Sequence, residues 1–208
     1  MTALENVLHV APVMPVVVIE DARHAVALAR ALVAGGIPAI EVTLRTRAAL
    51  DAVRAMADEV EGAIVGVGTV RKPQDLIEAE KAGARFAVSP GSTPALLAAA
   101  KDSALPWLPG AATASEVMTL AEHGFIYQKF FPAESAGGAA ALRSLHGPLP
   151  EVRFCATGGI GVHNARDYLG APNVACVGGS WLTPARLLAS GDWSEIEALA
   201  RAATLLRT

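Results

Sequence analysis

The sequence predicts an α/β fold, a single-domain (β/α)8 TIM barrel, and three observations lead to this expectation. Eight short apolar runs rich in valine and isoleucine recur along the 208 residues, and several are apolar at consecutive positions, as in strands buried on both faces. Alanine-rich stretches with helical spacing separate the runs, so each strand is joined to a parallel neighbour through a helix. The repeat of about 26 residues per strand–helix unit lies near the lower size limit of such barrels.

The expected strands are Met14–Ile19, Ala39–Leu44, Ala63–Val67, Arg85–Val88, Pro106–Leu108, Phe125–Phe131, Val152–Ala156 and Val174–Val177. The fifth run is the weakest, because prolines at 106 and 109 bracket it. The clearest expected helices are Ala22–Val33, Asp75–Lys81, Ser115–His123 and Trp193–Leu206. Glycines follow the first three and terminate them. Residues 1–208 are therefore expected to form one barrel domain with a short N-terminal segment and a C-terminal docking helix.

An open, doubly wound parallel sheet is the structural alternative. Folds of that class usually carry a glycine-rich phosphate loop directly after the first strand. Here the first strand is followed by Glu20, Asp21, Ala22 and Arg23, which form no such loop. The barrel is therefore the favoured architecture.

Composition excludes several classes of protein. A chain that is 52% hydrophobic and 18% charged buries a core and is not intrinsically disordered. With a net charge of −3 and scattered basic residues, it predicts no nucleic-acid partner. The apolar run Val10–Ile19 is too short to span a bilayer and lacks the basic start of a signal peptide, so no membrane partner is expected. Two cysteines cannot build a disulfide scaffold, which predicts a cytoplasmic protein.

Lys129 is the sharpest chemical signal. It alone among the four lysines lies inside an apolar strand. A buried ammonium without a partner is costly and tends to lose its proton, and a neutral amine can form a Schiff base with a ketone. The alternative is a lysine whose tip escapes at the strand end or pairs with a structural carboxylate.

Glu41 is the second unusual residue, because it lies between Ile40 and Val42 in a strand that otherwise belongs to the core. A carboxylate inside a barrel can carry protons as a general acid or base. The alternative is a buried ion pair, with Arg45 as one candidate partner. Lys129 and Glu41 together supply an amine and an acid/base, the minimum for imine chemistry.

Glycine pairs follow the last two strands: Gly158-Gly159 and Gly178-Gly179, the latter continued by Ser180. In barrels these two loops commonly bind phosphate through backbone amides, which glycine lets a ligand approach closely. Arg45 and Thr69 stand at the ends of two other strands and suit a carboxylate. No histidine or cysteine spacing indicates a metal site, so neither metal nor cofactor is expected.

Six segments occur in an order that resembles the 2-keto-3-deoxy-6-phosphogluconate (KDPG) aldolases. They are Glu41-Val42-Thr43-Leu44-Arg45-Thr46, Gly66-Val67-Gly68-Thr69-Val70, Ser89-Pro90-Gly91, Lys129-Phe130-Phe131-Pro132-Ala133-Glu134, Thr157-Gly158-Gly159-Ile160 and Gly178-Gly179-Ser180-Trp181. The resemblance covers nearly the whole chain and is more specific than any single motif. It implies a class I aldolase of the Entner–Doudoroff pathway, metal-independent and homotrimeric, with a phosphorylated keto acid as substrate.

The resemblance also implies a role for each matching residue. Lys129 matches the Schiff-base lysine and Glu41 the general acid/base. The positions matching substrate-binding residues are Arg45, Thr69, Pro90, Phe131 and Thr157, and those matching the phosphate site are Gly158, Gly159, Gly179 and Ser180. Ala156 departs from the family pattern, where proline is frequent, but this change removes no reacting group.

Two other functions remain open at the level of sequence. The same amine could act on 4-hydroxy-2-oxoglutarate or on the galactonate epimer of the substrate. A different class is a barrel that binds a sugar phosphate without a covalent imine, such as an epimerase or a regulatory binding protein. Epimerases of this fold typically use paired aspartates or metal-bound histidines, and the expected strand ends carry neither.

Overall fold

Nine parallel strands form one sheet within residues 2–207, the part of the chain that the computed structural model describes. The strands are β1 (Val13–Val17), β2 (Ala39–Thr43), β3 (Ile64–Gly68), β4 (Phe86–Val88), β5 (Trp107–Leu108), β6 (Gly110–Ala111), β7 (Tyr127–Phe130), β8 (Arg153–Thr157) and β9 (Val174–Gly179). Their order in the sheet is β5-β4-β3-β2-β1-β9-β8-β7-β6. All eight expected strands are present, and the sheet order follows the chain, as a barrel requires.

The ring closes through the fifth expected strand, which the structure shows as β5, and through β6, a second short strand that the sequence did not predict. β5 pairs with β4 and β6 pairs with β7, and only Pro109 separates the two short strands. Proline has no N–H group to continue a ladder, but the Pro109 carbonyl accepts a hydrogen bond from the Lys129 N–H at 2.7 Å. The (β/α)8 barrel is thereby confirmed and the open sheet is excluded.

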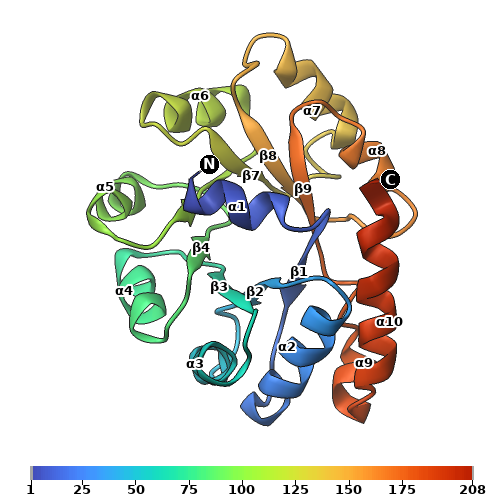
Figure 1. Ribbon diagram of the computed structural model, residues 1–208. Helices are drawn as coiled ribbons and strands as arrows, with labels where there is room; N and C mark the ends of the chain where they lie inside the picture. Colours follow the sequence, from blue (N-terminus) through green and yellow to red (C-terminus); the bar gives the residue numbers. More distant parts are fainter. Residues whose placement is uncertain (1, 208) are drawn as a thin grey trace.

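Helices surround the ring, except for the first, which lies across one end of it (Figure 1). They are α1 (Ala3–His9), α2 (Ala25–Ala34), α3 (Ala49–Glu59), α4 (Pro73–Lys81), α5 (Pro94–Asp102), α6 (Ala114–Glu122), α7 (Gly138–His146), α8 (Ala165–Leu169), α9 (Ala185–Ser190) and α10 (Trp193–Thr204), with 3-10 turns at Ala22–His24 and Leu205–Arg207. No helix within residues 2–207 has the length and apolar character needed to cross a membrane.

The expected helices are found with small shifts at their ends. The stretch expected as Ala22–Val33 begins with a 3-10 turn and becomes α-helical at Ala25, because Asp21 caps the tighter turn by accepting the Arg23 N–H. The last stretch is α10, which packs against α2. A Cβ atom at Gly35 would lie 2.5 Å from the Ala200 Cβ, so glycine lets the two helices approach this closely.

Helix α1 closes the barrel at the amino ends of the strands, a feature that the sequence did not predict. Thr2 and Glu5 form a capping box at its start. Val7 and Leu8 are buried in the inner core, together with Met14, Ala39, Phe86, Val88, Leu108, Cys155, Ala175 and Cys176. Figure 1 shows α1 lying across this end of the ring. The carboxyl ends of the strands are therefore the open mouth of the barrel.

Candidate active site

Lys129 and Glu41 meet inside the barrel. Lys129 lies on β7 and Glu41 on β2, and the Lys129 Nζ donates to the Glu41 Oε1 at 3.1 Å and to Oε2 at 3.5 Å. Lys129 is 5% exposed and Glu41 1%. The lysine tip thus does not escape to solvent, and the partner of Glu41 is Lys129 rather than Arg45.

Glycine on β3 makes room for the Glu41 side chain. A Cβ atom at Gly68 would lie 2.1 Å from the Glu41 Oε1 and 2.6 Å from its Cγ, far inside van der Waals contact. Gly68 is part of the motif Gly66-Val67-Gly68-Thr69-Val70, but no role was predicted for it. The signal was present, since glycine inside a strand often marks the close approach of another group.

The surroundings of the pair are mostly uncharged. The Lys129 Nζ lies 5.5 Å from the centroid of the Phe131 ring, and Cys155 is its register partner on β8. A hydrogen bond with the Cys176 thiol lowers the pKa of Cys155, burial acts in the opposite direction, and the charge of Lys129 adds to the lowering. Both cysteines are buried, as expected for core residues. Chemically, an amine and a carboxylate in contact can exchange a proton inside the barrel.

Arg45 and Thr69 follow β2 and β3 directly at the mouth. The Arg45 Nε donates to the Thr69 Oγ1 at 3.3 Å. Thr69 has φ 64°, and it is the one non-glycine residue within residues 2–207 with a positive φ. This conformation is costly for a β-branched residue and persists only where the surroundings enforce it. Two backbone hydrogen bonds flank it: Leu44 N–H to the Gly68 carbonyl and Val70 N–H to the Val88 carbonyl.

A cavity of about 370 Å³ opens at the mouth beside this pair. It is lined by Val16, Val18, Arg45, Phe131, Thr157, Gly158, Gly159, Ile160, Gly178, Gly179 and Ser180. The structure therefore brings together seven of the expected site residues in one cavity. Val16, Val18 and Ile160 were not expected, and apolar residues at strand ends give little in sequence to separate them from core residues.

The glycine loops shape this cavity. Gly158 and Gly159 have φ of 106° and 75°, which L side chains rarely adopt. A Cβ at Gly178 would lie 2.3 Å from the Thr157 Oγ1, and one at Gly179 would lie 1.7 Å from the Trp181 ring. Among the described residues, no acceptor is paired with the N–H groups of Gly158, Gly159 and Ser180. Unpaired backbone N–H groups around a cavity can bind an anion.

Four expected residues lie outside the cavity lining. Lys129 and Glu41 adjoin it through Phe131, and Thr69 adjoins it through Arg45. Pro90 is further removed. Its backbone lies against Gly110, where a Cβ would come within 2.3 Å of the Pro90 carbonyl carbon, and Gly110 is the register partner of Lys129.

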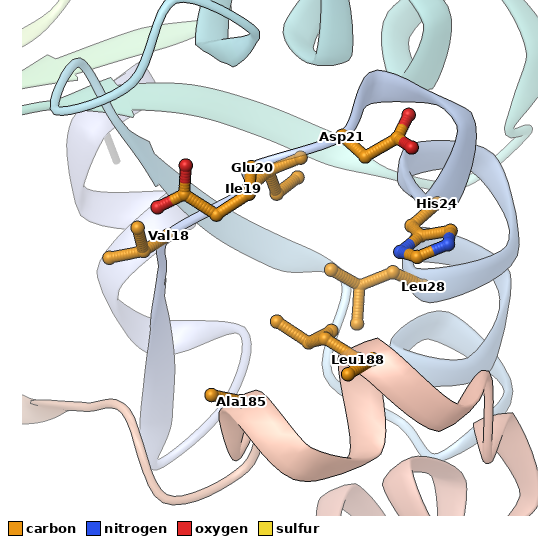
Figure 2. Close-up of a pocket in the computed structure, with 9 residues that line it drawn as sticks. Val18, Ile19, Glu20, Asp21, His24, Leu28, Ala185 and Leu188 are labelled. Atoms are coloured by element: carbon orange, nitrogen blue, oxygen red, sulfur yellow. The ribbon is translucent and has the colours of Figure 1, made fainter.

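A second pocket, of about 230 Å³, lies between the end of β1, α2 and α9 (Figure 2). Leu28 and Leu188 lie close together in it, and Glu20, Asp21 and His24 are also among its lining residues. It contains no amine, and Asp21 is already paired with Arg23 at 2.6 Å. This pocket therefore lacks the groups for imine chemistry. Within residues 2–207 no three His, Cys, Asp or Glu side chains cluster in a way that could hold a metal ion.

Comparison with known proteins decides the family. Residues 4–199 match the family described as "KDPG and KHG aldolase". The chain belongs to this aldolase family. Among its relatives, the "KHG/KDPG aldolase" of Escherichia coli (strain K12) is 52% identical over 202 residues, covering 97% of this chain and 95% of that protein.

The solved structures of other aldolases agree with this assignment. A Legionella pneumophila KDPG aldolase, 43% identical, aligns with a TM-score of 0.95 over 98% of both chains, and it holds pyruvate captured at low pH as a covalent carbinolamine intermediate. A KDPG aldolase of Zymomonas mobilis with 3-phosphoglycerate is 47% identical, with a TM-score of 0.92, and covers 98% of this chain and 95% of that one. This chain is thus an aldolase-family enzyme, in the class of carbon–carbon lyases.

Proposed function

We propose that this enzyme cleaves 2-keto-3-deoxy-6-phosphogluconate into pyruvate and glyceraldehyde 3-phosphate through a Schiff base on Lys129. The observation that carries the proposal is the 3.1 Å contact between the buried Lys129 Nζ and Glu41. An amine and a carboxylate held together inside the barrel provide both a nucleophile and a group to move its protons.

The reaction follows from these two groups. The Lys129 amine, having passed a proton to Glu41, attacks the C2 carbonyl carbon of the substrate. Glu41 returns this proton to the carbinolamine hydroxyl, which leaves as water and gives a protonated imine, so that Glu41 is again a carboxylate. The imine withdraws electrons from the C3–C4 bond, which breaks as Glu41, directly or through a water, takes the proton of the C4 hydroxyl. Glyceraldehyde 3-phosphate leaves, the enamine is protonated at C3, and water releases pyruvate from the lysine.

Substrate binding is proposed to use both sides of the mouth. Arg45 and Thr69 hold the carboxylate end, with Pro90, Phe131 and Thr157 beside the reacting carbons. The N–H groups of Gly158, Gly159 and Ser180 receive the phosphate, and Gly179, which has no side chain, leaves room for it beside them. Holding both ends places the breaking bond beside Lys129, and such positioning can supply several kcal/mol, about 7–11 in the best intramolecular cases.

The test is a coupled assay in which lactate dehydrogenase detects pyruvate released from the purified substrate. We expect turnover with the wild type and none with Lys129→Ala. A barrel that only binds sugar phosphates would show no turnover and would keep its phosphate affinity after Lys129→Ala.

A second candidate substrate is 4-hydroxy-2-oxoglutarate, also called 2-keto-4-hydroxyglutarate (KHG). The family description and the name of the Escherichia coli relative both include KHG and favour this substrate. The same amine and carboxylate serve it, and the galactonate epimer is a further variant. Cleavage rates on the purified substrates rank them. We propose in addition that the enzyme is a cytoplasmic homotrimer, on the basis of the family resemblance.

A further inference from the structure

Glu134 has no role in the proposed mechanism, although it lies five residues after Lys129. It occupies the turn between β7 and α7. Its Oε1 accepts a hydrogen bond from the hydroxyl of Tyr168 on α8. Glu134 is itself exposed, whereas Tyr168 is 1% exposed. An exposed carboxylate is thus fixed in place by a buried phenol.

The carbon chain of Glu134 packs directly on Gly159. A Cβ atom at Gly159 would lie 2.6 Å from the Glu134 Cγ and 2.7 Å from its Cβ. Glu134 therefore fills the space that any side chain at position 159 would need. Glu134 thus covers one face of Gly159, which lines the cavity at the mouth of the barrel.

Backbone hydrogen bonds tie the same turn to the same loop. The Ala133 N–H donates to the Thr157 carbonyl at 2.7 Å, and the Glu134 N–H donates to the Gly158 carbonyl at 3.0 Å. These two carbonyls belong to the same peptide groups as the N–H groups of Gly158 and Gly159. Both peptide groups are therefore held in place by the turn that contains Glu134. The glycines provide no side chain to fix the loop, so its orientation depends on these outside contacts.

The Tyr168 hydroxyl is a permanent donor in this arrangement. Burial, and then the hydrogen bond to Glu134, raise the pKa of Tyr168 well above its ordinary value. A raised phenol pKa favours the neutral form, so the hydroxyl keeps its proton throughout the pH range in which the enzyme would be assayed.

We propose that Glu134 is a positioning residue for the anion site: packed on Gly159 and tied to Tyr168, it orients the N–H groups of Gly158 and Gly159 toward the phosphate end of the substrate. The inference rests on the proposed function. It requires that Glu134 affect phosphate affinity and leave the chemistry of Lys129 unchanged.

The experiment compares Glu134→Ala, Glu134→Gln and Tyr168→Phe on phosphorylated and unphosphorylated 2-keto-3-deoxygluconate. For Glu134→Ala we expect KM for the phosphorylated substrate to rise about tenfold, the effect of losing one well-made contact, with kcat and KM for the unphosphorylated substrate little changed. Tyr168→Phe shifts the same KM in the same direction. Glu134→Gln keeps both the carbon chain and an oxygen acceptor, and it restores KM to near the wild-type value.

Two matched controls lie in the same chain. Ser135→Ala changes the next residue of the turn, and Tyr127→Phe removes the phenol that is hydrogen bonded to Glu5 at the closed end of the barrel. Neither should change the ratio of the two KM values. Equal changes of KM for both substrates in Glu134→Ala, no change, or a Glu134→Gln variant as poor as Glu134→Ala would overturn the inference.

Titration with inorganic phosphate separates this proposal from the proposed function. If the wild type released no pyruvate, the proposed function would fail, yet weaker phosphate binding by Glu134→Ala than by Ser135→Ala would still support the positioning role. Unchanged phosphate binding would refute it.

Discussion

Lys129 and Glu41 each stabilise the charge of the other, because both side chains are almost fully buried and have little contact with water. Removing one partner of a buried pair leaves the other uncompensated and typically costs about 3–5 kcal/mol. Substitutions at this pair therefore act on stability as well as on chemistry. Kinetic effects have to be read together with a measurement of folding.

Glu41→Gln tests the proton-transfer role. The amide keeps the shape and accepts a hydrogen bond but cannot take a proton, so kcat should fall by about 10²–10⁴, the usual contribution of a general acid/base. Pyruvate should still attach to Lys129 on standing, more slowly, because the nucleophile is intact. The coupled assay and mass spectrometry measure the two quantities, with Glu20→Gln as a control at the exposed rim. A kcat close to that of the wild type would contradict the role.

The sequence identified both members of this pair but not their contact. Lys129 and Glu41 each stand out as a charged residue inside an apolar strand, which is a local signal. Their partnership joins positions 88 residues apart, and the neighbouring Arg45 was an equally reasonable partner for Glu41. Only the curvature of the closed ring brings β2 and β7 across from each other.

At the scale of the element, β3 makes room for Glu41 because its last residue, Gly68, has no side chain. Gly68→Ala would place a methyl group 2.1 Å from the Glu41 Oε1 and force the carboxylate away from Lys129. We expect kcat to fall at least about tenfold, with phosphate affinity retained. Gly91→Ala is the matched control, because a Cβ there meets nothing within 4 Å. Equal activity of the two variants would show that the position of Glu41 is not set by β3.

Helix α1 contributes stability rather than chemistry. Leu8 is fully buried in the inner core at the closed end of the barrel, so Leu8→Ala should lower the free energy of unfolding by about 2–5 kcal/mol. Denaturant unfolding measures this loss. Below the melting temperature the variant should keep its KM and kcat, and a selective loss of activity would mean that α1 also shapes the site.

The strands were predictable because burial on both faces makes them continuously apolar. Four helices, α2, α4, α6 and α10, were predictable from their periodicity, and glycines end the first three, whereas α3, α5, α7, α8 and α9 were expected only as unspecified connections between strands. Helix α1 was missed, since seven residues are too few to establish a period. Strand β6 was also missed: Pro109 has no N–H group and ended the fifth expected strand, and the sequence alone does not show that its carbonyl accepts a hydrogen bond from Lys129.

At the scale of the whole molecule, the barrel has one functional end. Helix α1 fills the amino end, and the cavity, the ion pair and the glycine loops are at or below the carboxyl end. On the proposed function, the substrate enters and the products leave through the same mouth. The cavity also brings together residues from strands at opposite ends of the sequence.

The proposed homotrimer is a prediction at this scale. Size-exclusion chromatography with light scattering should give three times the 21.4 kDa mass of one chain. The mass should not change with substrate, because the proposed catalytic pair, Lys129 and Glu41, is already in contact within one chain. A monomer with full activity would contradict the trimer and leave the mechanism intact.

The most direct test of the central claim is chemical trapping of Lys129. The enzyme is incubated with pyruvate, reduced with borohydride, digested and mapped by mass spectrometry, with Lys101 in α5 as the internal comparison. The account predicts that one reduced pyruvate unit is added at Lys129, that none is added at Lys101, and that activity is lost in proportion. An unmodified Lys129, or an adduct on another residue with activity lost, would contradict it.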